Sequence, residues 1–160
     1  MKFLISFVLC VVICVNINAQ HTKIYNEDID RTTQIKEALS KAKSENKYVI
    51  CQVGGNWCVW CLRFAKFISE DAEINKVVQD NFIYIHVNYP SKDKEQDKLL
   101  MIRFNNAGRF GYPVPVVLDA DGNVMHLQDS GYLENGQSYD KEKVLRFFNN
   151  WSPKSVKTIK

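Results

Sequence analysis

The sequence lacks a strong excess of charge of either sign. Its 160 residues include 21 basic and 18 acidic side chains, which gives a formal net charge of +3. Charges this nearly balanced provide no strong steering toward nucleic acids or anionic membranes, so no nucleic-acid partner is expected. Long charge runs, internal repeats and low-complexity tracts are also missing. The length and the 46% hydrophobic fraction therefore predict one globular domain with short extensions.

The chain is also poor in side chains that bind metals or build a disulfide framework. Its histidines are scattered without the spacing of metal ligands, and only one C-x-x-C occurs, so no metal site is expected. Cys10 and Cys14 lie in an apolar N-terminal run, where both are interpreted as apolar filler. Cys51 lies inside a predicted strand and is expected to be a buried, unreactive thiol.

No apolar run reaches the roughly 20 residues that a membrane-spanning helix needs. The run Phe3–Val15 follows a basic residue and precedes a polar stretch with a small residue at its end. This pattern predicts a secretory signal peptide over Met1–Ala19 and a mature chain of residues 20–160 without a stable membrane span. An uncleaved anchor and a lipoprotein are alternatives, although neither Cys10 nor Cys14 follows a small residue. Export would place the remaining cysteines in a compartment that permits disulfides.

The stretch that carries the chemistry begins with Tyr48–Val53, an apolar, β-branched run that predicts a strand. Two glycines break this run, and Trp57 and a C-x-x-C at Cys58 and Cys61 lead into a helix-like segment. If Cys58 opens that helix, unpaired backbone N–H groups and the positive dipole end favour its thiolate. Cys61 lies one turn deeper on the same face, within reach of a disulfide. The spacing therefore predicts a redox pair in which Cys58 attacks and Cys61 resolves the mixed disulfide.

The periodicity along the chain predicts alternating helices and strands. Helices are expected over residues 33–46, from 58 to about 80 with a break between 67 and 74, over 93–106 and over 140–151. Strands are expected over residues 48–53, 82–89, 114–119 and 123–127, with a short edge strand at 24–25. Residues 131–138 are expected to form a loop, and the chain from Pro153 onward is expected to fray. A strand–helix–strand unit implies a parallel pair, to which the hairpin at 114–127 adds antiparallel strands.

A W-C-x-x-C between a short apolar strand and a helix is the signature of the thioredoxin superfamily. The chain resembles its secreted thioredoxin-like domains, such as the C-terminal domain of the electron-transfer protein DsbD. This resemblance implies an α/β thioredoxin-like fold, a central mixed β-sheet flanked by helices, over roughly residues 24–152. It also implies a cis-proline that faces the cysteines. Pro115 is assigned to that place, with Pro113 as the alternative, and the backbone of Val114 is then expected to pair with an extended client peptide.

The residues around the cysteines depart in part from the family pattern. Thioredoxins usually carry a buried acid at the position of Gln52, and an amide cannot take a proton from Cys61. Trp57 is interpreted either as ordinary packing or as a surface that flanks Cys58, and Trp60 is a further candidate for the substrate groove. Thioredoxins often carry Gly-Pro between the cysteines, and strong oxidants carry Pro-His. Neither a proline nor a cation is present here, so a reducing or intermediate couple is expected.

Taken together, the residues and the resemblance predict an exported thiol–disulfide oxidoreductase that acts on protein clients, with the reducing direction favoured. A dithiol donor would supply the electrons, so no cofactor is needed, and a monomer is expected. The bacterial periplasm or cell envelope is the natural compartment for such a protein. The alternative function is a non-catalytic binding module in which the bond between Cys58 and Cys61 is a structural disulfide.

Overall fold

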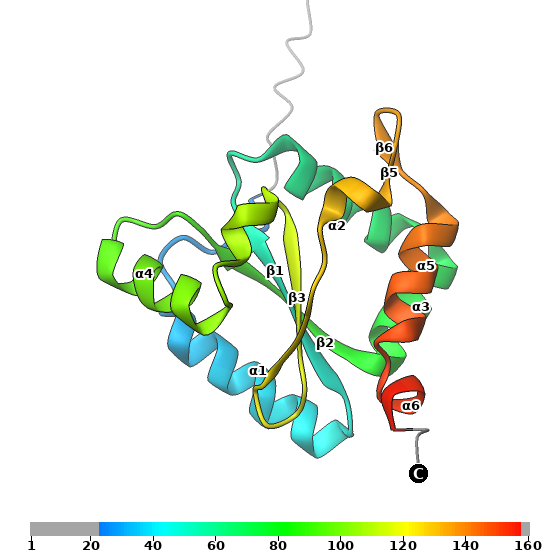
Figure 1. Cartoon of the computed structure of the whole chain (residues 1–160), viewed down its shortest axis with the longest axis horizontal. Coiled ribbons are helices and arrows are strands. Elements are labelled where there is room, and N and C mark those ends of the chain that lie inside the picture. Colours follow the sequence, from blue (N-terminus) through cyan, green and yellow to red (C-terminus); the bar gives the residue numbers. More distant parts are fainter. Residues whose placement is uncertain (1–22, 158–160) are drawn as a thin grey trace, which may run out of the picture.

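The computed structural model describes residues 23–157, so the predicted signal peptide lies outside the described residues. The central sheet has the strand order β2-β1-β3-β4, with β1 parallel to β2 and antiparallel to β3. β4 continues the sheet as the antiparallel neighbour of β3. The strands are β1 (Tyr48–Gly54), β2 (Phe82–Asn88), β3 (Val114–Leu118) and β4 (Val124–Leu127). This mixed sheet, flanked by helices, confirms the predicted thioredoxin-like α/β fold (Figure 1).

Helices cover both faces of the sheet (Figure 1). On one face, α1 (Arg31–Glu45) and α4 (Lys94–Arg103) pack against the sheet residues Val49 and Val53. On the other face, α2 (Val59–Glu70), α3 (Ala72–Asn81) and α5 (Lys141–Asn150) enclose Ile50. Successive residues of β1 thus point into opposite cores, as strand geometry requires. All of β1 is buried, which explains why it reads as a continuous apolar run.

Aspartates at the N-cap position explain where most of the long helices begin. The side chains of Asp30, Asp71, Asp93 and Asp140 accept backbone N–H groups in the first turns of α1, α3, α4 and α5. Asp71 also follows the last residue of α2, so it produces the predicted break between residues 67 and 74. Helix α2 is different because its N-cap residue is Cys58.

Two predictions for the ends of the chain are wrong. Ile24 and Tyr25 form no strand, and their backbone N–H groups both donate to Oδ1 of Asn56 at 3.1 Å. At the other end, the chain does not fray at Pro153, because Ser152 caps a short helix, α6 (Pro153–Val156). Pro153 is buried at the first position of that helix, where its missing N–H removes no hydrogen bond.

The segment predicted as a loop at residues 131–138 contains regular structure. A 3-10 turn, η2 (Ser130–Leu133), leads into a hairpin of β5 (Glu134–Asn135) and β6 (Ser138–Tyr139). Tyr139 is buried against α2, where its ring centroid lies 4.6 Å from that of Phe64. This long-range aromatic contact holds the hairpin beside α2, and local sequence cannot reveal it.

Candidate redox site

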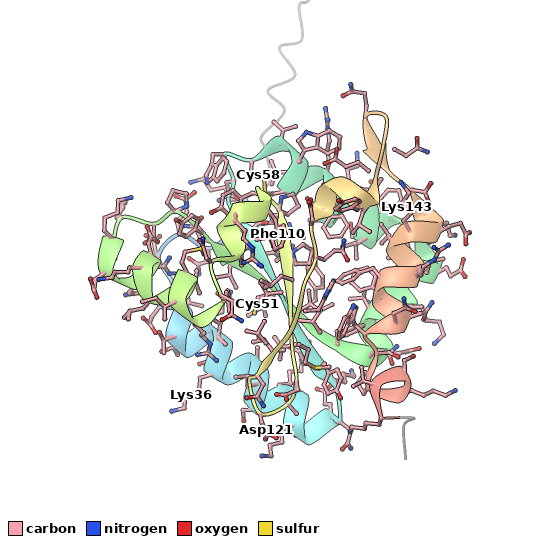
Figure 2. The ribbon with its side chains drawn as sticks, in the orientation of Figure 1. Lys36, Cys51, Cys58, Phe110, Asp121 and Lys143 are labelled. Carbon is pink, nitrogen blue, oxygen red and sulfur yellow. A yellow bond between two sulfur atoms is a disulfide. The ribbon has the colours of Figure 1, made fainter. Side chains whose placement is uncertain are left out.

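Cys58 and Cys61 form a disulfide at the N-terminus of α2. Figure 2 shows Cys58 beyond one end of the sheet, whereas Cys51 lies within its central part. The Sγ atom of Cys58 accepts the backbone N–H of Cys61 at 3.1 Å, so sulfur takes the place of a capping oxygen. In the reduced protein, this N–H and the positive end of the helix dipole stabilise a thiolate on Cys58.

The two cysteines differ in their access to solvent. Cys58 is 7% exposed, whereas Cys61 has no exposed surface. A thiolate that arrives from solvent can therefore reach Cys58 but not Cys61. Cys51 is buried as well, and burial raises the pKa of its thiol to about 12. A thiol with this pKa stays protonated at neutral pH, which agrees with the predicted unreactive state.

Exposed aromatic and aliphatic side chains surround Cys58 on its solvent side. Trp57 is 58% exposed and Val59 is 56% exposed. The Trp57 ring also packs edge-on against Tyr112 at a centroid distance of 5.7 Å, and its Nε1 donates to the carbonyl of Tyr89 at 3.1 Å. Trp57 therefore both packs on the neighbouring loops and flanks Cys58, so the two interpretations of this residue are compatible.

Trp60 turns toward the β5–β6 hairpin. Its ring lies edge-on to Tyr139 at 5.6 Å, and the hydroxyl of Tyr139 donates to the Trp60 carbonyl at 3.1 Å. The guanidinium of Arg63 lies 4.9 Å from the centre of the Trp60 ring and donates to Gln137 at 3.4 Å. Trp60 thus connects the redox helix to the hairpin, and Arg63 lies against this ring.

The prediction that Pro115 carries the cis bond is wrong. The X–Pro bonds in the cis form are Tyr89–Pro90 and Tyr112–Pro113. Pro115 lies inside β3 opposite Gln52, and its carbonyl accepts the N–H of Gln128 at 2.9 Å. Because strand pairing already occupies this backbone, Pro115 belongs to the sheet and not to the turn that precedes it.

The backbone group beside the cysteines was predicted to belong to Val114, but it belongs to Tyr112. Val114 is fully buried and pairs with Val53 of β1, so its side chain belongs to the core. The carbonyl oxygen of Tyr112 lies 3.6 Å from Sγ of Cys58. The carbonyl beside the Cys58 sulfur therefore comes from the residue before Pro113, the proline that was only the alternative in the sequence.

Gln52 lies beneath Cys61, as the sequence position predicts, and has no exposed surface. Its Nε2 donates to the Cys61 carbonyl at 3.0 Å and also to the hydroxyl of Tyr25. Its Oε1 accepts the hydroxyl of Tyr84 at 2.6 Å. The amide is thus fully hydrogen-bonded, and the position where thioredoxins carry an acid holds a group that does not ionise.

Burial disfavours the charged forms of the groups beneath Cys61. It raises the pKa of the Tyr25 phenol well above its usual value, an effect that the hydrogen bond from Gln52 only partly offsets. Burial likewise raises the pKa of Tyr84. His86, which packs edge-on against Tyr25 at 5.2 Å, has its pKa lowered to about 4 because burial disfavours the charged imidazole.

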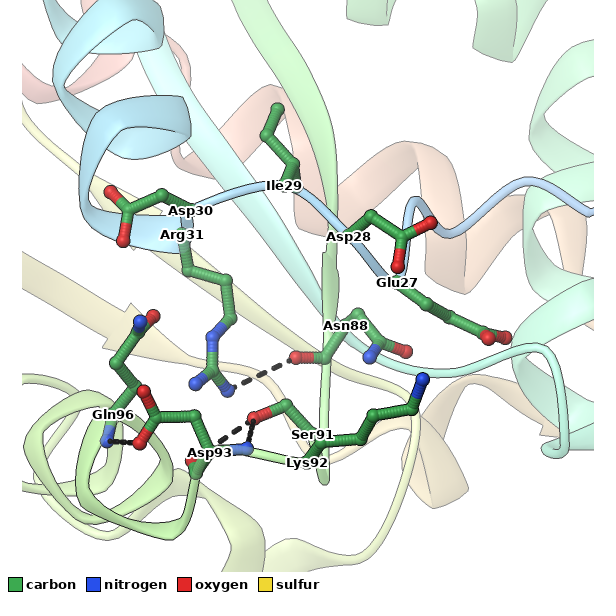
Figure 3. A pocket seen from close by; sticks show the side chains of 10 residues that line it. All are labelled: Glu27, Asp28, Ile29, Asp30, Arg31, Asn88, Ser91, Lys92, Asp93 and Gln96. Atoms are coloured by element: carbon green, nitrogen blue, oxygen red, sulfur yellow. Dashed lines mark hydrogen bonds between the residues drawn. The ribbon is translucent and has the colours of Figure 1, made fainter.

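A separate polar hollow lies at the carboxyl end of β2 (Figure 3). Arg31, which is 4% exposed, donates from Nη1 to Asp97 of α4 and, at 3.3 Å, to the carbonyl of Asn88. Burial acts to raise the pKa of Asp97, but hydrogen bonds from Arg31 and Ser91 outweigh it and lower the pKa overall. The side chain of Arg31 thus joins the first helix to α4, and the carboxylates around the hollow make it unsuited to an anion.

No group of three or more His, Cys, Asp or Glu side chains within residues 23–157 could hold a metal ion. No helix in the same range is long and apolar enough to cross a membrane.

The sequence does not identify the tyrosines that surround the redox helix. Tyr84 could have been found, because it alternates with His86 along the strand, and His86 is the parallel neighbour of Gln52. Tyr25 has no local signal, since only its contacts with Asn56 and Gln52 bring it beneath Cys61. Tyr139 reaches the helix through the β5–β6 hairpin, which also has no clear sequence signal.

Comparison with known proteins agrees with this architecture. The profile of the family described as "Thioredox_DsbH: Protein of unknown function, DUF255" matches residues 19–154. The thiol:disulfide interchange protein DsbD of Colwellia psychrerythraea is 24% identical over 118 residues, which are 73% of this chain and 18% of that protein. The chain spans only between about a tenth and a fifth of the length of the curated relatives it matches.

Solved structures show the same fold. The disulphide isomerase from Xylella fastidiosa superposes with a TM-score of 0.66 at 24% identity, covering 79% of this chain and 94% of that one. The C-terminal domain of Neisseria meningitidis DsbD in the oxidised form superposes with a TM-score of 0.52 at 18% identity, covering 76% and 96%. Because the family profile covers most of the chain, this protein belongs to the Thioredox_DsbH family, within the thioredoxin superfamily.

Proposed function

We propose that this protein is an oxidoreductase that exchanges its dithiol for disulfides in protein clients. The observation that carries the proposal is the unequal placement of the two sulfurs. Cys58 caps α2 and reaches the surface, whereas Cys61 is fully buried one turn deeper. An attacking sulfur needs access and a stabilised thiolate, and a resolving sulfur needs protection from other partners.

The exchange conserves atoms and electrons in two steps. The Cys58 thiolate attacks one sulfur of a client disulfide, and the other client sulfur leaves as a thiolate that takes a proton from water. The Cys61 thiolate, formed by loss of its proton to water, then attacks Sγ of Cys58. The bond between Cys58 and the client breaks, and its electron pair leaves on the client sulfur. The client gains two electrons, and a separate dithiol donor reduces the resulting disulfide.

The surroundings of Cys58 support an extended peptide as the client. Trp57 and Val59 provide exposed apolar surface on which client side chains can pack. The Tyr112 carbonyl next to the sulfur is a free acceptor for a client backbone N–H once Cys58 has reacted. The groove that we propose therefore consists of Trp57, Val59 and Tyr112, and the predicted residues Val114 and Pro115 support it from within the sheet.

The reducing direction is the one that the site favours. A strong oxidant stabilises its reduced form through additional interactions with the thiolate of the attacking cysteine. Here the residues between the cysteines are Val59 and Trp60, and the nearby Arg63 lies over the Trp60 ring. The N-terminal end of α2 is then the main stabiliser of the thiolate, which favours an intermediate or reducing couple.

The remaining parts of the proposal concern the whole chain. Residues 20–160 are proposed to act as one thioredoxin-like domain after removal of a signal peptide at residues 1–19. The pattern of the first 19 residues and the similarity to DsbD support export, with the bacterial periplasm or cell envelope as the compartment. A monomer is the form we propose.

A turnover assay tests the proposed function. We expect the protein to accelerate the reduction of insulin by dithiothreitol, and we expect Cys58→Ala to abolish the acceleration. Cys51→Ala is the matched control, since it removes a buried thiol that lies outside the site and should keep the activity. If the wild-type protein gave no acceleration, the alternative of a binding module with a structural disulfide would replace this proposal.

A further inference from the structure

The space beneath Cys61 is filled by a phenol–amide network, which consists of Tyr25, Gln52 and Tyr84. Its members come from the N-terminal segment, from β1 and from β2. Tyr25 is 1% exposed and Gln52 is 0% exposed, so water does not compete for their polar atoms. A hydrogen bond in such surroundings is stronger than one at the surface.

The chemistry of the groups fixes the direction of every hydrogen bond in this network. The Cys61 carbonyl can only accept, so Gln52 must turn Nε2 toward it, and Oε1 then accepts the hydroxyl of Tyr84. One hydrogen of Nε2 goes to the carbonyl, and the other goes to the oxygen of Tyr25. Tyr25 is therefore an acceptor in this bond, and its own O–H hydrogen is left for a different acceptor.

Gly54 is a common neighbour of the Cys61 sulfur and of this hydroxyl. A Cβ atom placed on Gly54 would lie 2.4 Å from Sγ of Cys61 and 3.0 Å from the oxygen of Tyr25. The sulfur and the phenol oxygen thus approach the same side of the glycine. Tyr25 also packs in one buried cluster with Cys58 and Cys61. Within residues 23–157, the Tyr25 hydroxyl has no hydrogen bond other than the one from Gln52.

We propose that the Tyr25 hydroxyl donates a hydrogen bond to the Cys61 thiolate during exchange. Tyr25 is then a catalytic residue that touches the resolving sulfur, whereas Gln52, which donates to the oxygen of Tyr25, is the positioning residue that orients it. This inference rests on the proposed function, because it assigns a residue to the resolving step. Gln52 holds the sequence position of the buried thioredoxin acid, and the neutral phenol hydrogen-bonded to it assists by stabilising charge and not by removing a proton.

The proton of Tyr25 stays on its oxygen throughout. In the forward step the Cys61 thiol loses its proton to water, and its thiolate attacks Cys58 while the client sulfur leaves. In the reverse step, when a donor dithiol reduces the disulfide, Cys61 leaves as a thiolate and the same hydrogen bond stabilises it. In the reduced protein, Cys58 is a neighbour that ionises, because it packs in the same cluster. The other titratable groups around Tyr25 are Tyr84, His86 and Tyr139, whose charged forms burial disfavours, since it raises the pKa of the phenols and lowers that of the imidazole.

The ionisation of Cys61 in the reduced, full-length protein tests this inference. It is followed by the carbon-13 chemical shift of Cys61 Cβ against pH, which separates this thiol from the other cysteines. We expect Tyr25→Phe to make Cys61 about tenfold less acidic, the lower end of what a hydrogen bond to a charged group supplies. Tyr84→Phe is the matched control, since it removes a phenol hydroxyl from the same network without removing a donor to the sulfur.

The rate of resolution gives a second readout. Below the midpoint of Cys61 ionisation, Tyr25→Phe should resolve mixed disulfides about threefold more slowly, because a tenfold smaller thiolate fraction is partly offset by greater nucleophilicity. Above the midpoint the loss should disappear. A general structural defect would instead lower the rate at every pH.

Unchanged Cys61 acidity in Tyr25→Phe, or an equal change in Tyr84→Phe, would overturn the inference. If Tyr25→Phe does not fold, the Tyr84→Phe variant is produced with 3-fluorotyrosine in place of every tyrosine. The fluorinated Tyr25 is a stronger hydrogen-bond donor, so Cys61 should be more acidic than in Tyr84→Phe with ordinary tyrosine. No change there would also overturn it. The acidity measurement does not depend on turnover, so a failure of insulin reduction would reject the proposed function separately.

Discussion

The two cysteines of the disulfide are surrounded by different kinds of chemical groups. On the outer side, Cys58 meets exposed Trp57 and Val59 and the backbone carbonyl of Tyr112. On the inner side, Cys61 meets the buried phenol–amide network, in which the amide of Gln52 has a partner for each polar atom. The outer side presents exposed apolar side chains, whereas the inner side is buried and polar.

The surroundings on which the proposed roles of the two cysteines rest therefore come from tertiary contacts as much as from the motif. The C-x-x-C spacing places one sulfur at the helix N-terminus and the other a turn deeper. Segments distant in sequence then complete each side. Tyr112 approaches Cys58 from the loop before β3, and Tyr25 approaches Cys61 from the N-terminal segment.

The largest expected effect is a difference in stability loss between alanine variants of two adjacent glycines. Gly54 faces the buried sulfur of Cys61, and Gly55 faces the ring of Trp57. A Cβ on Gly54 would lie 2.4 Å from the buried sulfur of Cys61, whereas a Cβ on Gly55 would meet the exposed ring of Trp57 at 2.3 Å. Gly54→Ala should therefore lower the free energy of unfolding by about 3 kcal/mol, because a packed core resists added volume. Gly55→Ala should cost about 1 kcal/mol or less, because an exposed ring can rotate away.

Denaturant unfolding of the oxidised forms of both variants measures this difference. Equal losses of stability would mean that the inner side is no more tightly packed than the outer side. The contrast on which the account depends would then be lost.

A smaller effect concerns the charge state of the inner side. The pKa of His86 is lowered from 6.5 to about 4 in the folded protein, so below pH 6.5 the unfolded chain binds a proton that the folded chain does not. The free energy of unfolding should keep its full value above pH 6.5 and fall as pH decreases toward 4. From pH 7 to pH 5 the loss from this residue should be at most about 2 kcal/mol.

His86→Phe provides the control, because it keeps a ring between Tyr25 and Tyr84 and removes the ionisation. Unfolding curves at pH 7 and pH 5 should show a smaller loss in this variant than in the wild type. The same pH dependence in both proteins would show that His86 is free to take up a proton in the folded state.

The smallest effect on stability is expected at Trp57, on the solvent side of Cys58. Trp57→Ala removes a side chain that is 58% exposed, so the free energy of unfolding should change by less than about 1 kcal/mol. Reduction of a peptide disulfide should nevertheless slow about fivefold, roughly 1 kcal/mol of lost binding in the transition state. Reaction with a small disulfide reagent should not slow, since it does not use this surface. Equal slowing with both substrates would show that Trp57 acts on Cys58 itself.

The sequence predicts those features that short-range patterns determine. The buried run of β1, the helix that opens at Cys58 and the break at Asp71 all follow from periodicity, spacing and capping. The position of Gln52 beneath Cys61 also follows, because the family pattern fixes its distance from Trp57. These features are sufficient to predict the fold and the disulfide.

Features that depend on contacts between distant segments are not predictable in this way. The choice between Pro113 and Pro115 depends on where β3 starts to pair with β1, and the sequence offers both prolines before the same apolar run. Tyr25 and Tyr139 reach the redox helix from the two ends of the chain through side-chain contacts. Local periodicity does not indicate such contacts, so the phenol–amide network is visible only in the structure.

The most direct test of the division of roles between the two cysteines is the trapping of mixed disulfides with clients. The account predicts that Cys61→Ala accumulates long-lived complexes through Cys58, because the partly accessible Cys58 thiolate still attacks and no resolving thiol remains. Cys58→Ala should accumulate few, since Cys61 has no exposed surface. Equal trapping by the two variants, or more by Cys58→Ala, would contradict the assignment of an outer attacking and an inner resolving cysteine.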